Sequence, residues 1–149
     1  MAVTETGATL SIYGRTKDAT AAAVTLALGI EPTSSHEFGD PHPSATLAAR
    51  GRRTENSRWG FSEPETEASE ADFHGMLSLD RLAERFEPKA EILAALSERY
   101  EIRVWLLGHS DDESQHGFVI SAATMRRLGV LSASLWPDIY SAGSTDPER

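Results

Sequence analysis

Residues 100–107, YEIRVWLL, are the part of the chain that decides the fold. Ile102, Val104 and Leu106 alternate there with Arg103 and Trp105. Successive side chains of a β-strand point to opposite faces of a sheet, so this alternation is typical of a strand that buries one face. The stretch therefore predicts a half-buried strand, with Arg103 and Trp105 opposite the apolar face.

Similar patterns on both sides of this strand predict further strands and helices. Alternation with period two predicts strands, and apolar residues along one helical face predict helices. Gly29 is placed to end the first helix, and Pro88 suits the first turn of a new one. The predicted strands cover residues 8–13, 46–53, 57–62, 100–107, 117–120 and 130–140. The predicted helices cover residues 18–28, 73–86, 88–99 and a short segment capped by Ser121.

This order of elements predicts an α+β protein. Strands and helices are interleaved, but residues 108–116 look like a hairpin loop, which favours a mainly antiparallel or mixed sheet with helices packed on one face. Residues 8–140 are predicted to form a single domain, between a flexible N-terminal tail at 1–7 and a disordered C-terminal tail at 141–149. The predicted shared core consists of Ile12, Val104, Leu106, Phe118 and Ile120.

The composition and charge of the chain exclude several kinds of site and favour one kind of binding partner. The 149 residues contain no cysteine and carry a formal charge of −9. The missing cysteines exclude disulfides, thiolate metal sites and cysteine nucleophiles, and the acidic balance argues against nucleic-acid binding. We expect no membrane segment and no signal peptide, hence a cytoplasmic protein. The acidic charge favours a basic protein partner, whereas the sequence leaves the oligomeric state open.

The loop at residues 28–43, LGIEPTSSHEFGDPHP, holds the first candidate site. His36, Asp40 and His42 are residue types that bind metals or ligands. The spacing of the two histidines in a proline-broken loop does not fix a metal geometry, so we predict no metal and no cofactor. A rigid helix-to-strand connector is the favoured interpretation, and a contact surface for a small molecule or a protein is the alternative.

The segment at residues 50–59, RGRRTENSRW, holds the second candidate site. Arginine side chains match carboxylate and phosphate geometry, which makes Arg52 and Arg53 binding candidates. The simpler alternative is that these arginines pair with the acidic run that follows at 63–72. Trp59 is interpreted as an anchor, either in the core or at an interface.

Motifs in a fixed order along the chain resemble one known family. They are a strand ending in Tyr-Gly, a helix closing with Leu-Gly-Ile-x-Pro-Thr, then Gly-Asp, Arg and Trp before a strand, Gly-Phe-x-Ile-Ser and a final Asp-Ile-Tyr. The matching residues are Tyr13, Gly14, 28–33, Gly39, Asp40, Trp59, 117–121 and 138–140. This layout resembles the bacterial family of domain of unknown function 4279. The resemblance implies a small bacterial α+β protein, of a kind associated with immunity or accessory roles, and it carries no reaction or catalytic residue.

Known enzyme signatures are absent from the sequence. There is no Gly-x-Ser-x-Gly, Walker phosphate loop, Gly-x-Gly-x-x-Gly or His-Glu-x-x-His, so no catalytic residue is assigned. The leading hypothesis is a non-enzymatic module that binds another protein, as an immunity or regulatory partner. The alternative is a small-molecule binder or enzyme that uses a His/Asp/Arg pocket near residues 36–58.

Overall fold

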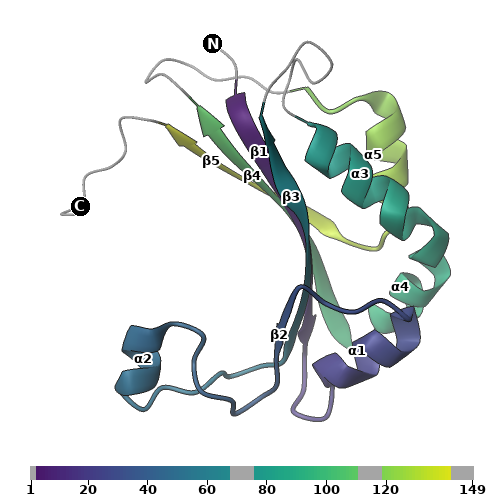
Figure 1. Cartoon of the computed structure of the whole chain (residues 1–149). Helices are drawn as coiled ribbons and strands as arrows, with labels where there is room; N and C mark the ends of the chain where they lie inside the picture. Colours follow the sequence, from purple (N-terminus) through teal and green to yellow (C-terminus); the bar gives the residue numbers. More distant parts are fainter. Residues whose placement is uncertain (1–2, 68–75, 111–118, 142–149) are drawn as a thin grey trace.

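A computed structural model describes residues 3–67, 76–110 and 119–141, and its centre is a five-stranded sheet (Figure 1). The strand order is β2-β3-β1-β4-β5. All neighbours pair antiparallel except β4 and β5, which are parallel, so the sheet is mixed. The strands are β1 (Val3–Gly14), β2 (Ser34–His36), β3 (Arg58–Glu67), β4 (Tyr100–Ser110) and β5 (Ser134–Ser141).

The alternation of residues 100–107 is confirmed by β4. Ile102, Val104 and Leu106 are all buried, at 4% exposure or less. On the other face of the sheet, Arg103 lies beside Trp136 of the neighbouring strand β5. The local pattern thus assigned both the strand and its inner face correctly, because burial on one face imposes period two.

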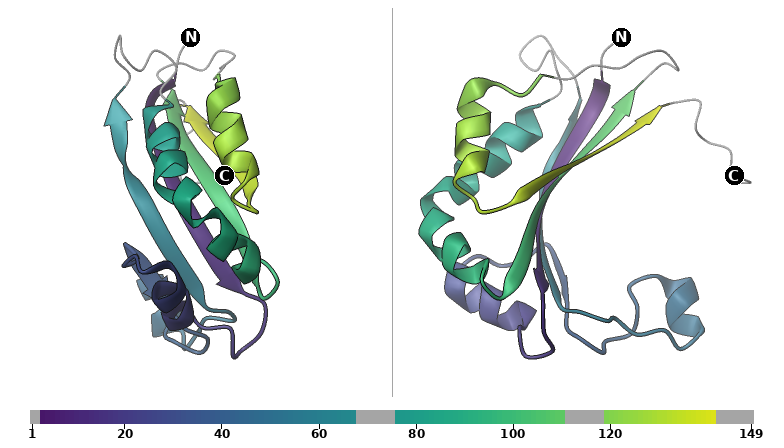
Figure 2. Two further views of the ribbon diagram at one scale, coloured as in Figure 1. Left: turned by 90° about the vertical axis from the view of Figure 1, so that its right-hand side faces the viewer. Right: turned by 180° about the vertical axis from the view of Figure 1, so that it is seen from behind.

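Four α-helices cover one face of the sheet, as Figure 2 shows from the side and from behind. They are α1 (Ala21–Leu28), α3 (Leu77–Phe86), α4 (Ala90–Leu96) and α5 (Ala122–Gly129), with the 3-10 turn η1 (Glu87–Lys89) between α3 and α4. The core between the helices and the sheet is apolar, and its largest fully buried side chains include Trp59, Phe86 and Leu10. The predicted α+β class, with helices packed on one face, is confirmed for these four helices.

The ends of the first helix follow from local chemistry. The Thr20 hydroxyl accepts the N–H of Ala23 at the start of α1, and Gly29 ends the helix in the left-handed conformation with φ 67°. Pro88 lies in η1, where its missing N–H costs nothing. The predicted helix end at Gly29 and the break at Pro88 are therefore confirmed.

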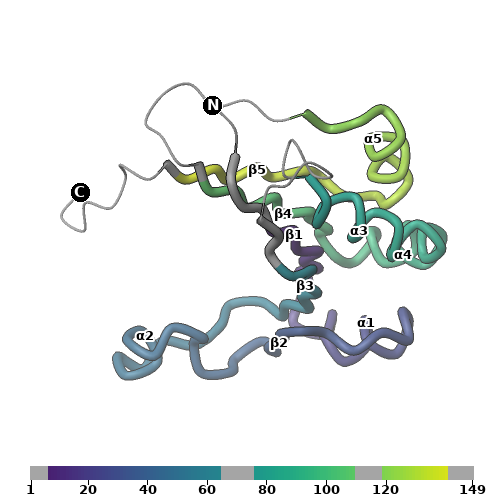
Figure 3. The backbone as a smooth tube through the Cα atoms, turned by 45° about the horizontal axis from the view of Figure 1, so that its top comes forward, coloured from purple at the N-terminus to yellow at the C-terminus, as the bar shows by residue number. Residues whose placement is uncertain are grey.

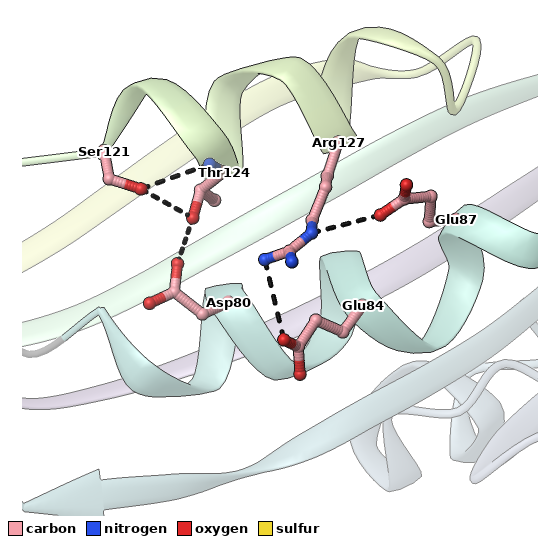
Figure 4. A network of polar contacts seen from close by, with 6 residues as sticks. All are labelled: Asp80, Glu84, Glu87, Ser121, Thr124 and Arg127. Carbon is pink, nitrogen blue, oxygen red and sulfur yellow. Dashed lines mark hydrogen bonds and ion pairs between the residues drawn. The ribbon is translucent and has the colours of Figure 1, made fainter.

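A polar network attaches α5 to α3 (Figure 4). The Thr124 hydroxyl donates a hydrogen bond to the carboxylate of Asp80. Arg127 donates from Nε to Glu87 at 3.0 Å, and its Nη1 lies 3.6 Å from a carboxylate oxygen of Glu84. Because Thr124 is only 2% exposed, its hydroxyl needs a partner within the protein.

The strand predicted at residues 46–53 is wrong. Residues Ala45–Ala49 form the short helix α2, followed by a turn at Gly51. The Ser44 hydroxyl accepts the N–H of Leu47 and starts the helix. Arg50 and Arg52 therefore do not share one face of a strand.

The predicted strand at 117–120 is also not found in the described part. Val119 and Ile120 lie outside any strand, whereas Phe118 lies outside the described residues. The chain therefore reaches β5 through α5, and this crossover makes β5 parallel to β4. Ile12, Val104 and Leu106 share one core, with Ile120 packed against it.

Several boundaries differ from the predicted ones. β1 begins at Val3 and β5 ends at Ser141, so both strands enter segments that were predicted as tails, because pairing with β4 continues beyond the apolar alternation. β3 runs to Glu67, and α3 begins at Leu77. The predicted helix start at residue 73, most of the loop at 108–116 and the tail at 142–149 fall outside the described residues. No helix in the described part is long and apolar enough to cross a membrane.

Candidate functional site

Five of the six candidate residues lie on or at the base of one projection, which we call the arm. The arm comprises residues 37–57, between β2 and β3. The residues on either side of it, His36 of β2 and Arg58 of β3, are paired with each other in the sheet. Figure 3 shows that α2, in the arm, lies on the opposite side of β2 from α1. The arm therefore stands on the side of the sheet that the four packed helices leave open (Figure 1).

The base of the arm is held by backbone hydrogen bonds. Gly39 donates to the carbonyl of Thr54 at 3.0 Å, and Thr54 donates back to the carbonyl of Asp40 at 2.9 Å. The Asp40 carboxylate accepts the N–H of Glu37 at 2.8 Å, and Gly39 takes φ 83°. Asp40 thus stabilises a turn, which supports the rigid-connector interpretation of this loop.

Glu37 ties the arm to the helical layer. Its two carboxylate oxygens accept the N–H groups of Ala21 and Ala22 at 2.6 and 3.2 Å. These are free N–H groups at the start of α1, where a negative charge is favoured. Although the arm projects from the sheet, its first residue is therefore fixed.

A pocket of about 430 Å³ opens between the arm and its base. Its walls include polar, basic and apolar side chains, and the residues that line it are His36, His42, Pro43, Leu47, Arg52, Arg53, Thr54, Glu55 and Asn56. A neighbouring hollow is lined by His36 and Pro43 as well, together with Asp40 and Arg58. The structure thus brings His36, His42, Arg52 and Arg53 to one pocket, with Asp40 next to it.

The basic and imidazole groups of the pocket differ in how they are held. Arg53 donates to the carbonyl of Gly39 at 2.8 Å, whereas the Arg52 guanidinium has no partner within the described residues. His42 Nδ1 accepts the N–H of Ser44 at 3.0 Å, which leaves Nε2 as a donor. Partial burial, followed by the nearby Arg58 charge, lowers the pKa of His36, which favours its neutral form.

No metal centre is built from this set of residues. Within the described ranges, no group of three or more histidine, aspartate or glutamate side chains is arranged to hold a metal ion. The absence of a metal or cofactor from the working protein stays a prediction.

Trp59, the sixth candidate, does not reach the arm. Its side chain is fully buried on the helical side of the sheet, with its ring edge against Phe86 at a centroid distance of 6.1 Å. Its Nε1 donates to the Thr25 hydroxyl at 3.0 Å. Of the two interpretations given to Trp59, the structure bears out the core anchor, and its side chain is not on the surface of the described protein.

The predicted pairing of the arginines with the acidic run is not seen in the described part. Arg58 donates instead to the hydroxyls of Ser34 and Ser11, both at 2.9 Å. Glu63, the first acid of that run, accepts from Arg85 of α3 at 2.5 Å. The structure does not describe the side chains of residues 65–67 or the segment 68–75.

The structure also shows a surface that the sequence patterns did not predict. On the sheet face that α1, α3, α4 and α5 leave uncovered, the Arg103 guanidinium lies 4.2 Å from the ring centroid of Trp136 and 5.0 Å from that of Tyr13. Trp105 packs against Trp136 at 5.3 Å between centroids. We call Tyr13, Arg103, Trp105 and Trp136 the aromatic row. In the sequence, only the position of Arg103 and Trp105 opposite the apolar face pointed to this surface. The parallel pairing of β4 with β5 brings Trp136 beside them.

The fold and these surfaces define a single α+β domain with a mixed sheet, one helix-covered face and one open face. Residues 4–142 match the family model described as Domain of unknown function (DUF4279), so the chain belongs to that family. Comparison with curated proteins and with solved structures finds no match.

Proposed function

We propose that the protein is a non-enzymatic binding protein whose open sheet face docks a basic protein partner. One observation carries the proposal: large aromatic side chains stay exposed on a sheet face that the described helices leave uncovered. Trp136 is 39% and Tyr140 is 47% exposed. Tryptophan, tyrosine and arginine are the residue types that dominate binding energy at protein interfaces.

The aromatic row and the neighbouring Tyr140 are ordered by contacts within the protein itself. Arg103 is fixed between the rings of Tyr13 and Trp136, and its Nε donates to Glu101 at 3.0 Å. The Tyr140 hydroxyl donates to Asp138 at 2.8 Å, and its ring stacks on His109. Side chains that are ordered in the free protein lose less entropy on binding, which favours affinity.

Charge supports a basic partner. The protein carries a formal charge of −9, and Glu101 offsets the Arg103 charge on the open face. Long-range attraction speeds the encounter with a basic protein, and the aromatic side chains, once covered by the partner, then slow dissociation. Such a protein would act as an immunity or regulatory partner, and we expect it in the cytoplasm.

Site-specific crosslinking tests the proposal. A photoreactive phenylalanine analogue replaces Trp136 in one variant and Leu26 in a control, since Leu26 is 86% exposed on α1 at the helical side. We expect a basic protein to crosslink from position 136 and not from position 26. The purified partner should then bind Trp136→Ala at least about tenfold more weakly than the unchanged protein.

Two results would contradict the proposal. The purified partner could bind the Trp136→Ala variant as tightly as the parent protein, or crosslinking could occur equally from both positions. Either outcome would show that the open face does not hold the partner.

The alternative function, a small-molecule binder or enzyme, is favoured by the pocket of the arm. Four of the candidate residues line that pocket, and pockets of this size suit small ligands. No nucleophile paired with a general base is evident among them, so the pocket supports binding rather than a reaction.

A further inference from the structure

The pocket of the arm has the composition of an anion site within an acidic protein. Arg52 and Arg53 supply two permanent positive charges, and Glu55 supplies one negative charge. His36 and His42 add imidazole groups that need no charge to act as hydrogen-bond donors. The local balance is therefore positive, although the formal charge of the whole chain is −9.

The hydrogen bonds of the arm leave N–H donors of Arg52, Arg53 and His42 available, whereas the His36 imidazole is engaged with the backbone of Asn56. Arg53 uses Nη1 on the Gly39 carbonyl, so its remaining N–H groups are not committed to that bond. His42 presents Nε2 because its Nδ1 is occupied by the N–H of Ser44. The guanidinium of Arg52 has neither an ion-pair nor a hydrogen-bond partner among the residues that the structure describes, and planar guanidinium groups bind oxyanions in a bidentate manner.

The pocket also has an apolar wall, made by Pro43 and Leu47. Its volume of about 430 Å³ exceeds what a bare inorganic ion needs. A ligand with an apolar body joined to one oxyanion group would fill both parts of the pocket.

We propose that the pocket of the arm binds a small organic anion, with Arg52 and His42 holding its oxyanion group and Leu47 packing against its apolar body. Carboxylates and phosphate monoesters share the required oxyanion. This site is independent of the protein-binding function proposed above, because the aromatic row lies on the sheet and not in the arm.

Calorimetric titration with three probes tests the proposal: inorganic phosphate, phenyl phosphate and benzoate. We expect phenyl phosphate or benzoate to bind the unchanged protein, and whichever binds identifies the oxyanion. Arg52→Gln should weaken that binding about tenfold or more. Leu47→Ala should weaken the binding of the aromatic probe, and any binding of inorganic phosphate should stay unchanged.

Arg126→Gln is the matched control, because it removes the same charge from an exposed position on α5. It should change the affinity less than about twofold, since only general electrostatics is altered. Amide NMR spectra of each variant check its folding and locate the bound probe in the 42–56 segment.

The proposal is overturned if the unchanged protein binds none of the three probes at about 10 mM. It is equally overturned if Arg126→Gln weakens binding as much as Arg52→Gln. The Trp136→Ala variant should bind the probe normally, so failure of this site and failure of the protein-binding surface give different results.

Discussion

Replacing Trp59 with alanine should destabilise the whole domain and leave the arm intact. The Trp59 side chain is fully buried, and its ring packs at right angles against Phe86 with 6.1 Å between centroids. Truncation of a buried tryptophan to alanine costs about 3–5 kcal/mol of unfolding free energy, because contacts are lost and a cavity remains. At about 2–4 °C per kcal/mol for a protein of this size, the melting temperature should fall by about 6–20 °C.

A double-mutant cycle isolates the single hydrogen bond of this tryptophan. The Trp59 Nε1 donates to the Thr25 hydroxyl at 3.0 Å. Trp59→Phe and Thr25→Val each remove that bond from one side, so the two effects should fail to add. The expected coupling is about 0.5–1.5 kcal/mol, the net value of a neutral hydrogen bond.

Urea denaturation followed by far-ultraviolet circular dichroism measures both effects, and it does not depend on tryptophan fluorescence. Trp136→Ala is the comparison, because its side chain is 39% exposed on the open face. That variant should lose less than about 1.5 kcal/mol, chiefly its ring contacts with Trp105 and Arg103. An unchanged urea midpoint for Trp59→Ala would refute the assignment of Trp59 to the core.

The remaining predictions concern a close backbone contact, a buried hydroxyl and a histidine. Gly14→Ala should lower the unfolding free energy by about 1–3 kcal/mol, since a Cβ would lie 2.3 Å from the Ala19 carbonyl oxygen. Gly129→Ala is the control and should not be destabilising, because the space around Gly129 is open. Equal urea midpoints for the two variants would contradict the close contact at Gly14. Thr124→Val should lower the unfolding free energy by about 1.5–3 kcal/mol, because the Asp80 carboxylate loses a buried hydrogen-bond donor. Thr46 is exposed, so Thr46→Val should change the unfolding free energy by less than about 0.5 kcal/mol in the same assay. The pKa of His36 in the folded protein lies below its unfolded value of about 6.5, so the unfolded state binds more protons. The stability that comes from a neutral His36 is therefore fully present above about pH 6.5, and it is lost as the pH falls through the folded pKa. Unfolding free energies measured between about pH 5 and pH 7.5 should therefore fall more steeply towards acid for the unchanged protein than for His36→Gln, and identical slopes would disprove it.

The candidate site was partly predictable from residue types. Histidine and arginine near residues 36–58 indicated a polar pocket as an alternative, and His36, His42, Arg52 and Arg53 do line one. The sequence could not show that Asp40 is used to brace a turn or that Trp59 points to the opposite face. Both outcomes depend on pairing with β-strands and helices that are distant along the chain.

The sequence alone determined the features that depend on neighbours within a few residues. The alternation around Val104 specified a half-buried strand, Gly29 ended the first helix, and Pro88 separated the two that follow. These signals are local because strand alternation, helix capping and the missing proline N–H act over a single turn or pair of residues.

Only the tertiary structure decided the features that depend on contacts between distant segments. The crossover through α5 made β5 parallel to β4 and brought Trp136 beside Trp105, which a predicted hairpin would not have done. The hydrogen bonds of Glu37 to α1 fixed the base of the arm, whereas the Ser44 cap that makes residues 45–49 a helix is a local signal. The physical reason is that strand neighbours and side-chain hydrogen-bond partners are chosen by the packing of the whole chain, so no local pattern of residues contains that choice.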